Sequence, residues 1–202
     1  MINIDVLNLG PMDNCTYLVT QGADALLIDP AWDPQFIIHT LEQKKLHLWA
    51  VLFTHGHFDH VKFSQTLLEH FGVKAYLEES DIPLAGLPPE LLHTYRGDQQ
   101  VKIGPFNVQI LATPGHTAGG VCILLEDALF TGDTLFPGAC GRVDLPSSNP
   151  RDMLASLRRI AALPEDTRIF AGHSYGGRCS STVADEKLHN PYMRNALRWE
   201  EK

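Results

Sequence analysis

The segment THGHFDH, residues 54–60, places three histidines and one aspartate within seven positions. It continues directly from residues 48–54 (LWAVLFT), an apolar run of the length of a buried strand. Several neutral imidazoles beside a carboxylate are costly to desolvate unless a partner satisfies them. Neutral histidine is the commonest metal ligand among side chains, and carboxylates complete sites of the zinc or iron type. The segment therefore indicates a metal site rather than a solvated polar loop.

The spacing within this segment suits two ions. Gly56 gives the loop flexibility, so His55 and His57 can converge on one ion. Asp59 and His60 follow in the segment and can reach a second ion. A centre of this kind needs further ligands, which must come from other parts of the chain.

Three later predicted strands also end in a residue that can bind a metal. ATPGHT offers His116, FTGD offers Asp133 and FAGH offers His173, and each lies beside a glycine that permits a tight turn. Any one of them alone could be a loop histidine or a turn aspartate. Four separate strand ends that each present a ligand-type residue indicate a shared centre. The other five histidines lack this context, and we expect surface or packing roles for them: His39, His47, His70, His93 and His189.

Strands alternate with helices along the chain, and this order must bring the strand ends together. Apolar runs and turn signals predict strands at residues 2–9, 15–20, 25–30, 48–54, 73–77, 106–113, 120–126, 128–133 and 167–173. Helices are predicted at residues 34–45, 61–72 and 150–163, the last with Asn149 as its N-cap. Residues 83–98 are rich in proline and glycine and predict a surface loop. A polar loop and a short helical tail are expected at the end of the chain.

Both halves of the chain are rich in strands and carry helices. This pattern predicts two sheets packed face to face with helices on the outside. No linker or low-complexity segment separates the halves. We therefore expect a single domain over residues 1–202.

The composition limits the classes of partner. A net charge of −8 argues against a nucleic-acid partner, because binding phosphates needs clustered lysine and arginine. No stretch approaches the roughly eighteen consecutive apolar residues of a membrane span, and the first residues show no signal peptide. The four cysteines form no CxxC pair. We expect a cytoplasmic protein that acts on a small molecule, and the sequence leaves the oligomeric state open.

The ordered set THxHxDH, PGHT, TGD and GH resembles the metallo-β-lactamase superfamily over nearly the whole chain. The resemblance implies an α/β fold, a four-layer αββα sandwich of two mixed sheets with outer helices. It also implies two divalent metal ions per chain at one edge of the sheets, zinc first, with iron or manganese as alternatives. The implied ligands are His55, His57 and His116 for one ion, and Asp59, His60 and His173 for the other, with Asp133 bridging.

A second pair of stretches narrows the resemblance. FTGDTLFPGACGR (residues 130–142) and GHSYG (residues 172–176) look like the glyoxalase II group, the hydroxyacylglutathione hydrolases, which hydrolyse glutathione thioesters. In that group a basic residue after Cys-Gly and a tyrosine after Gly-His-x contact glutathione, which implies substrate binding by Arg142 and Tyr175. This sequence has Asp144 where the group has an aromatic residue, and lacks room after residue 173 for the helical domain of full-length members. It therefore resembles the short, single-domain branch.

The predicted activity is hydrolysis of a small thioester, a glutathione conjugate. Bound metal ions lower the pKa of water to about 7 and polarise a carbonyl, so metal-bound hydroxide would attack the thioester. Asp59 and Asp133 would be the catalytic carboxylates, with Asp59 helping to orient the nucleophile.

Two alternatives remain at this point. The same residues equally resemble glutathione persulfide dioxygenases, in which one Fe(II) is held by the equivalents of His55, His116 and Asp133. A non-catalytic metal-binding protein is the third interpretation, and the complete ligand set argues against it. The stretch GDTLF favours the hydrolase.

Overall fold

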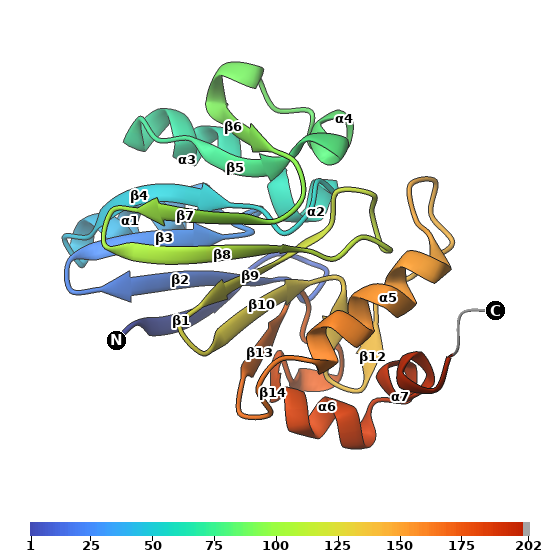
Figure 1. Ribbon diagram of the computed structural model, residues 1–202. Helices are drawn as coiled ribbons and strands as arrows, with labels where there is room; N and C mark the ends of the chain where they lie inside the picture. The colour runs from blue at the N-terminus through green and yellow to red at the C-terminus, as the bar shows by residue number, and fades with distance from the viewer. Residues whose placement is uncertain (200–202) are drawn as a thin grey trace.

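Two six-stranded mixed sheets lie face to face in the computed structural model, which describes residues 1–199 (Figure 1). The first sheet has its strands in chain order: β1 (Asn3–Asn8), β2 (Cys15–Gln21), β3 (Asp24–Ile28), β4 (His47–Leu52), β5 (Ala75–Glu78) and β6 (Leu92–Tyr95). The second sheet runs in the spatial order β14 (Ser180–Thr182), β13 (Arg168–Ala171), β10 (Ala128–Gly132), β9 (Val121–Leu125), β8 (Phe106–Ala112) and β7 (Gln99–Ile103). A short hairpin follows β10, formed by β11 (Leu135–Phe136) and β12 (Ala139–Cys140).

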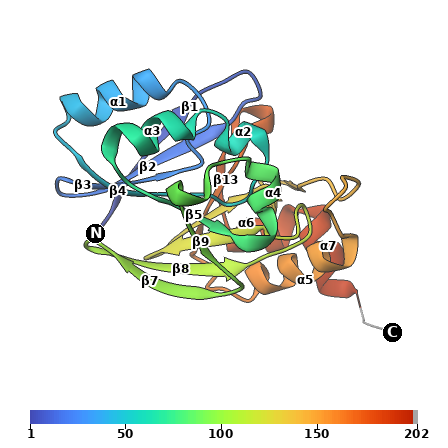
Figure 2. The ribbon, with the colours of Figure 1, turned by 90° about the horizontal axis from the view of Figure 1, so that it is seen from above.

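Helices cover the outer face of each sheet, as the two views show (Figures 1 and 2). On the first sheet they are α1 (Pro34–Gln43), α2 (Phe58–Val61), α3 (Ser64–Phe71) and α4 (Ile82–Ala85). On the second sheet they are α5 (Pro150–Ala161), α6 (Val183–His189) and α7 (Pro191–Arg198). One apolar cluster lies between the sheets and one lies under each set of helices. The predicted four-layer αββα architecture is therefore confirmed.

The apolar pattern of each strand matches its place in these layers. Strand β8 alternates: Phe106, Val108 and Ile110 are buried between the sheets, and the residues between them are exposed. Strand β10 is buried on both faces, with Phe130 in the central cluster and Leu129 in the cluster under α5. A strand covered on both sides needs a continuous apolar run, whereas a strand with one open face needs only alternation.

The start of α5 is fixed by Asn149, as predicted. Its side chain accepts hydrogen bonds from the backbone N–H groups of Arg151 and Asp152, which satisfies donors that the helix itself leaves unpaired. The backbone N–H of Asn149 donates to the carbonyl of Gly115 at 2.8 Å. The first turn of α5 therefore holds the loop that carries His116.

Three predicted segments differ from the structure. The helix predicted at residues 61–72 is two helices, α2 and α3, because the chain turns at Phe63, whose N–H donates to the carbonyl of Ala31 instead of continuing a helix. The loop predicted at residues 83–98 contains β6, which pairs parallel with β5. The prolines of this segment favoured a loop, and β6 is a short strand that forms only beside a neighbouring strand, here β5. Strands β7 and β14 were not predicted, and the tail is two helices rather than one.

No helix within residues 1–199 combines the length and apolar character that crossing a membrane requires.

One edge of the sandwich receives the ends of β4, β10 and β13 together with the loop between β8 and β9 (Figure 1). Backbone hydrogen bonds join the two sheets here: Cys15 N–H donates to the Gly172 carbonyl, and Val121 N–H donates to the Thr54 carbonyl, both at 2.8 Å. These links fix the distance between the strand ends of opposite sheets. Side chains that follow those strands must therefore meet.

Gly132 provides a test of how tightly this edge is built. Its φ of +48° lies in the left-handed region, and a β-carbon at this position would overlap the side chain of Thr54. Gly22 has a φ of +65°, and no atom lies within 4 Å of the β-carbon position. We expect Gly22→Ala to lower the free energy of unfolding by roughly 1–2 kcal/mol, from backbone strain alone. Gly132→Ala should lower the free energy of unfolding by the same strain and by roughly 1–3 kcal/mol more, because the added carbon overpacks against Thr54.

The measurement is urea denaturation of chelator-treated protein. Equal losses of unfolding free energy in the two variants would mean that the edge adapts to an extra carbon.

Candidate metal centre

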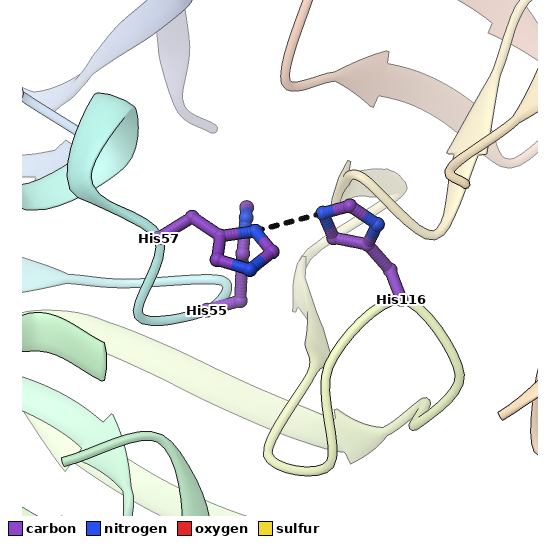
Figure 3. A group of neighbouring side chains, drawn as sticks. All are labelled: His55, His57 and His116. Carbon is purple, nitrogen blue, oxygen red and sulfur yellow. Dashed lines mark hydrogen bonds between the residues drawn. The ribbon is translucent and has the colours of Figure 1, made fainter. Parts of the chain in front are cut away.

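Three groups of three ligand atoms lie at this edge, each with its atoms within 4.8 Å of one another, and two of them match the predicted ligand sets; the third is Asp29, His55 and His60. The first group is His55, His57 and His116, which Figure 3 shows converging from two loops. The second group is Asp59, His60 and His173. The structure therefore brings together the side chains from four separate strand ends that the sequence singled out.

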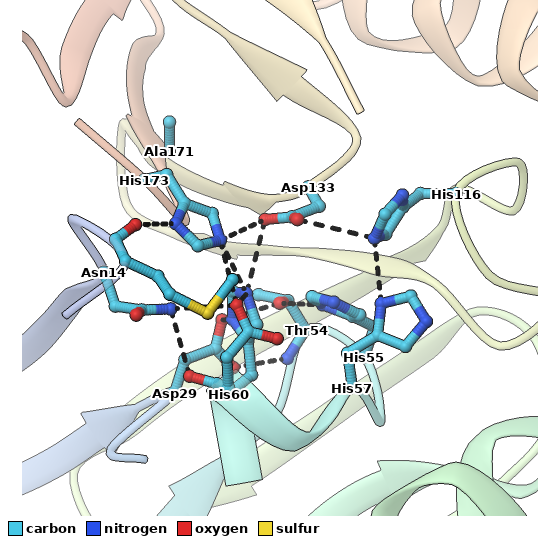
Figure 4. Close-up of polar contacts among 12 residues, drawn as sticks. Asn14, Asp29, Thr54, His55, His57, His60, His116, Asp133, Ala171 and His173 are labelled. Atoms are coloured by element: carbon cyan, nitrogen blue, oxygen red, sulfur yellow. Dashed lines mark hydrogen bonds and ion pairs between the residues drawn. The ribbon is translucent and has the colours of Figure 1, made fainter. Parts of the chain in front are cut away.

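Asp133 lies between the two groups (Figure 4). Its Oδ2 is 3.4 Å from Nε2 of His116 in the first group. Its Oδ1 is 3.4 Å from Nε2 of His60 and 3.5 Å from Nε2 of His173 in the second group. One oxygen thus faces each group, which is the arrangement that a bridging carboxylate requires.

Several polar atoms of the centre fit metal ions better than they fit each other. Nε2 of His55 and Oδ1 of Asp133 are buried without a hydrogen-bond partner within residues 1–199. Nδ1 of His57 faces Nε2 of His116 at 2.9 Å. Buried polar atoms without partners are rare and costly; a cation in the first group would satisfy the three histidine nitrogens, and one in the second group would satisfy Oδ1 of Asp133. Nitrogen and carboxylate oxygen form the donor set that zinc and iron prefer, so these residues fit two divalent ions.

A second contact orients the ring of each buried histidine. A histidine that binds a metal through one nitrogen usually uses the other in a hydrogen bond, which fixes its tautomer and direction. Four rings have such a contact at Nδ1: His55 with Thr54 Oγ1 at 3.1 Å, His60 with Asp29 Oδ2 at 2.9 Å, His116 with the Arg142 carbonyl at 2.9 Å, and His173 with the Met12 carbonyl at 2.7 Å. Each of these rings keeps Nε2 for the centre.

Asp29 is a functional residue that the sequence reasoning missed. It is 4% exposed and accepts hydrogen bonds from the N–H and the hydroxyl of Thr54, at 2.8 and 2.6 Å, besides contacting His60. It thereby positions His60, a ligand of the second group, and Thr54, which precedes His55 of the first group. The signal was available, because Asp29 follows the apolar run ALLI as directly as His55 follows its own strand.

Asp81 and Asn14 also position the ligand loops. Asp81 is fully buried and accepts hydrogen bonds from the N–H groups of Gly56 and Gly119 and from the hydroxyl of Thr117. It therefore joins the loop of the first two histidines to the loop of the third. Asn14 donates through Nδ2 to Oδ2 of Asp59 at 3.2 Å and to its carbonyl at 3.0 Å.

The two groups differ in how strongly they hold protons. Burial and neighbouring imidazoles lower the pKa of His55 and His57, so both rings are neutral at pH 7. Burial would also lower the pKa of His60 and His173, but nearby carboxylates outweigh it. They raise the pKa of His60 well above its usual value and that of His173 to about 9.

The carboxylates show the converse effect. Burial would raise the pKa of Asp59, yet the interaction with His173 and the charge of His60 hold it at about 2. For Asp133, burial is outweighed in the same way by the charge of His60, and its pKa lies well below the usual value. Both carboxylates are therefore ionised at neutral pH and available as ligands.

A cavity of about 970 Å³ opens onto the centre. Five of the seven predicted ligands lie on its wall: His57, Asp59, His116, Asp133 and His173. The other two, His55 and His60, do not line the cavity. Arg142 and Tyr175 also lie on the wall, as expected for residues that contact a substrate. Tyr175 stacks on the ring of His173 with centroids 4.9 Å apart. Arg142 is exposed and makes two hydrogen bonds to Asp144, at 2.9 and 3.0 Å.

We expect the second group to bind its metal more tightly as the pH rises from about 7 to about 9. His60 and His173 carry protons at pH 7, and a ligating nitrogen must lose its proton, so affinity should rise about tenfold per pH unit for each proton displaced. His55 and His57 are already neutral, so the first ion should respond weakly to pH in this range.

Competition titration of chelator-treated protein with a chromophoric zinc chelator measures both affinities. Equal pH slopes for the two ions would contradict this assignment of protons.

Comparison with known proteins identifies relatives of this chain. The Metallo-beta-lactamase superfamily matches residues 10–173. The probable polyketide biosynthesis zinc-dependent hydrolase PksB of Bacillus subtilis is 34% identical over 184 residues, which cover 90% of this chain and 82% of the relative. The hydroxyacylglutathione hydrolase GloC of Haemophilus influenzae is 32% identical over 216 residues, which cover 96% of this chain and 99% of the relative.

Solved structures show the same architecture. ETHE1 from Myxococcus xanthus aligns with a TM-score of 0.85 at 29% identity, over 99% of this chain and 92% of that one. TTHA1623, crystallised in a di-iron-bound form, aligns with a TM-score of 0.81 at 34% identity, over 93% of this chain and 99% of that one. The superfamily match covers both sheets except the edge strands β1 and β14, and it includes every residue of the two ligand groups. The chain therefore belongs to the metallo-β-lactamase superfamily.

Proposed function

We propose that this protein is a binuclear metal-dependent hydrolase of a small thioester, with a glutathione conjugate as its substrate. The observation that carries the proposal is the position of Asp133, with one carboxylate oxygen toward His116 and the other toward His60 and His173. A carboxylate in this position could bind two ions at once. The two complete ligand groups on either side of it support the same conclusion.

The relatives support the class of reaction and the kind of cofactor. GloC is named as a hydroxyacylglutathione hydrolase, PksB as a probable zinc-dependent hydrolase, and TTHA1623 was crystallised with two irons. We propose zinc as the first choice of metal, with iron or manganese as alternatives. The net charge of −8 supports a small-molecule substrate rather than a nucleic acid. A cytoplasmic location is part of the proposal.

When bound, two divalent ions would lower the pKa of water toward 7 and polarise the thioester carbonyl. Asp59 lies on the cavity wall and is ionised at neutral pH, so it can accept a hydrogen bond from water and orient it. Burial and the nearby carboxylates raise the pKa of Tyr175, so its phenol stays protonated and can donate to the thiol-bearing part of the substrate. Arg142 would bind a carboxylate of that part.

A second candidate is an Fe(II)-dependent glutathione persulfide dioxygenase. The similarity to ETHE1 favours it. A single iron would need only His55, His116 and Asp133, and would leave Asp59 and His173 without a role as ligands. The dioxygenases share all seven of these residues, so the second group does not separate the candidates, and the stretch GDTLF is the reason to prefer the hydrolase.

His173→Ala separates the two candidates. A hydrolase with two ions needs His173 for the second ion, so the variant should lose one metal per chain. Thioester hydrolysis should fall by about two orders of magnitude or more, since the polarising ion is lost. Metal content by mass spectrometry and hydrolysis of a glutathione thioester by metal-loaded protein provide the two readouts.

Two variants control for indirect effects. Tyr175→Ala removes the ring that stacks on His173 and should keep both metals. His189→Ala removes an exposed histidine away from the centre and should change neither readout. Rapid oxygen uptake with glutathione persulfide that survives in iron-loaded His173→Ala would overturn the hydrolase and support the dioxygenase.

Substitutions of Arg142 and Asp144 test whether Arg142 binds the thiol-bearing part of the substrate. Arg142→Ala should raise KM for a glutathione thioester by several-fold to about tenfold, with little change in kcat, because an exposed ion pair contributes modestly. Asp144→Asn should lower KM, since it frees the guanidinium from its intramolecular partner. Steady-state kinetics of both variants measure this. A KM that stays the same in both would mean that the carboxylates of glutathione bind elsewhere.

A further inference from the structure

The cavity extends from the metal centre over a surface of apolar side chains. These come from β11, from the loop before α5 and from α5 itself: Phe136, Val143, Leu145, Met153, Leu154 and Leu157. Phe136, Met153 and Leu157 are at most 5% exposed, so they form a fixed floor rather than a mobile cover. Tyr192 of α7 lies on the same cavity. We name this set of residues the apolar wall.

The apolar wall is continuous with the reaction centre. A β-carbon at Gly115 would overlap the backbone of Met153, so the loop of His116 lies directly against α5. A group attached to a carbonyl at the centre therefore meets the apolar wall without crossing solvent. The cavity volume of about 970 Å³ lies at the upper end of small-molecule sites, roughly 300–1,000 Å³. The part of this volume beside Arg142 and Tyr175 would take the thiol-bearing part of the substrate, and the part beside the apolar wall is left for the acyl group.

Charge is confined to the centre and to one exposed pair. Among the described residues that line the cavity, Arg142 is the only lysine or arginine, and it is already paired with Asp144. Asp59 and Asp133 belong to the metal centre. The apolar wall offers no cation to a carboxylate, and a charged group placed against it would lose its hydration without compensation.

The two sides of a thioester can therefore be assigned to two parts of the cavity. Arg142, with 65% of its side chain exposed, and Tyr175, 55% exposed, suit the charged thiol-bearing part, which can remain hydrated. The apolar wall, in which Phe136, Met153 and Leu157 are buried, is left for the acyl group. We propose that the substrate is a thioester of an apolar, extended acyl chain, which binds along Met153, Leu154 and Leu157. This inference rests on the proposed thioester hydrolysis and specifies its acyl group.

Binding of S-alkyl glutathiones to the metal-free protein tests the wall without turnover. We expect Kd to fall by about fourfold for each added methylene from S-methyl to S-octyl glutathione, as each leaves water for an apolar surface. The metal-loaded protein should show the same trend in kcat/KM across acetyl, butanoyl, hexanoyl and octanoyl glutathione.

Leu154→Trp should fill the space beside α5 and lower the octanoyl-to-acetyl ratio of kcat/KM by about tenfold. Leu197→Trp adds the same side chain at an exposed position of α7 outside the cavity and should keep the ratio of the wild type. Val143→Asn provides a second, polar substitution in a loop, in case the first variant does not fold, and should lower the ratio as well.

The outcomes separate this inference from the proposed function. Hydrolysis of all the thioesters at rates that do not rise with chain length, with equal Kd for the short and long S-alkyl glutathiones, would overturn the apolar acyl chain and leave thioester hydrolysis standing. An absence of hydrolysis for every thioester by protein loaded with two metals would overturn the proposed function and this inference with it.

Discussion

The burial of carboxylates among imidazoles is the constraint on which the rest of the structure depends. Asp29 and the side chain of Asp133 are largely removed from water, where an unpaired charge is strongly destabilising. Their partners come from different loops. His60 contacts both Asp29 and Asp133, whereas His116 and His173 contact Asp133 but not Asp29. The loops therefore need one another. An element that moved away would leave a buried charge without compensation.

Close approach of backbones makes this arrangement possible. A β-carbon at Gly172 would lie 2.6 Å from Oδ1 of Asp133, and one at Gly141 would overlap the carbonyl oxygen of Asp133. Glycine leaves room for the carboxylate of Asp133 at Gly172 and for its backbone carbonyl at Gly141. The glycines beside the ligands thus have a spatial role as well as a role in turns. They let strand ends from two sheets approach until their side chains share one small volume.

Two different parts of the fold form the cavity. The metal ligands come from loops at the edge of the two sheets, which are fixed by hydrogen bonds between the sheets. The apolar wall comes mostly from β11, α5 and the loop before it. In the proposed function, a change in the apolar wall would alter the acyl group that fits without touching a predicted metal ligand. Reaction chemistry and substrate preference would then have separate structural origins, joined where α5 packs on Gly115.

The sequence by itself determined the residue types and their order. Ligand-type residues that follow apolar runs indicated the centre, and the continuous apolar run at residues 48–54 indicated a buried strand. It could not determine β6, β7 or β14, because short strands with several polar residues form only when a neighbour supplies the hydrogen bonds. Nor could it show that Asp133 faces both ligand groups, that Asp29 fixes His60, or that Asp144 holds Arg142. Those are distances between residues far apart in the chain or set by side-chain direction, and only the packing of one sheet on the other decides them.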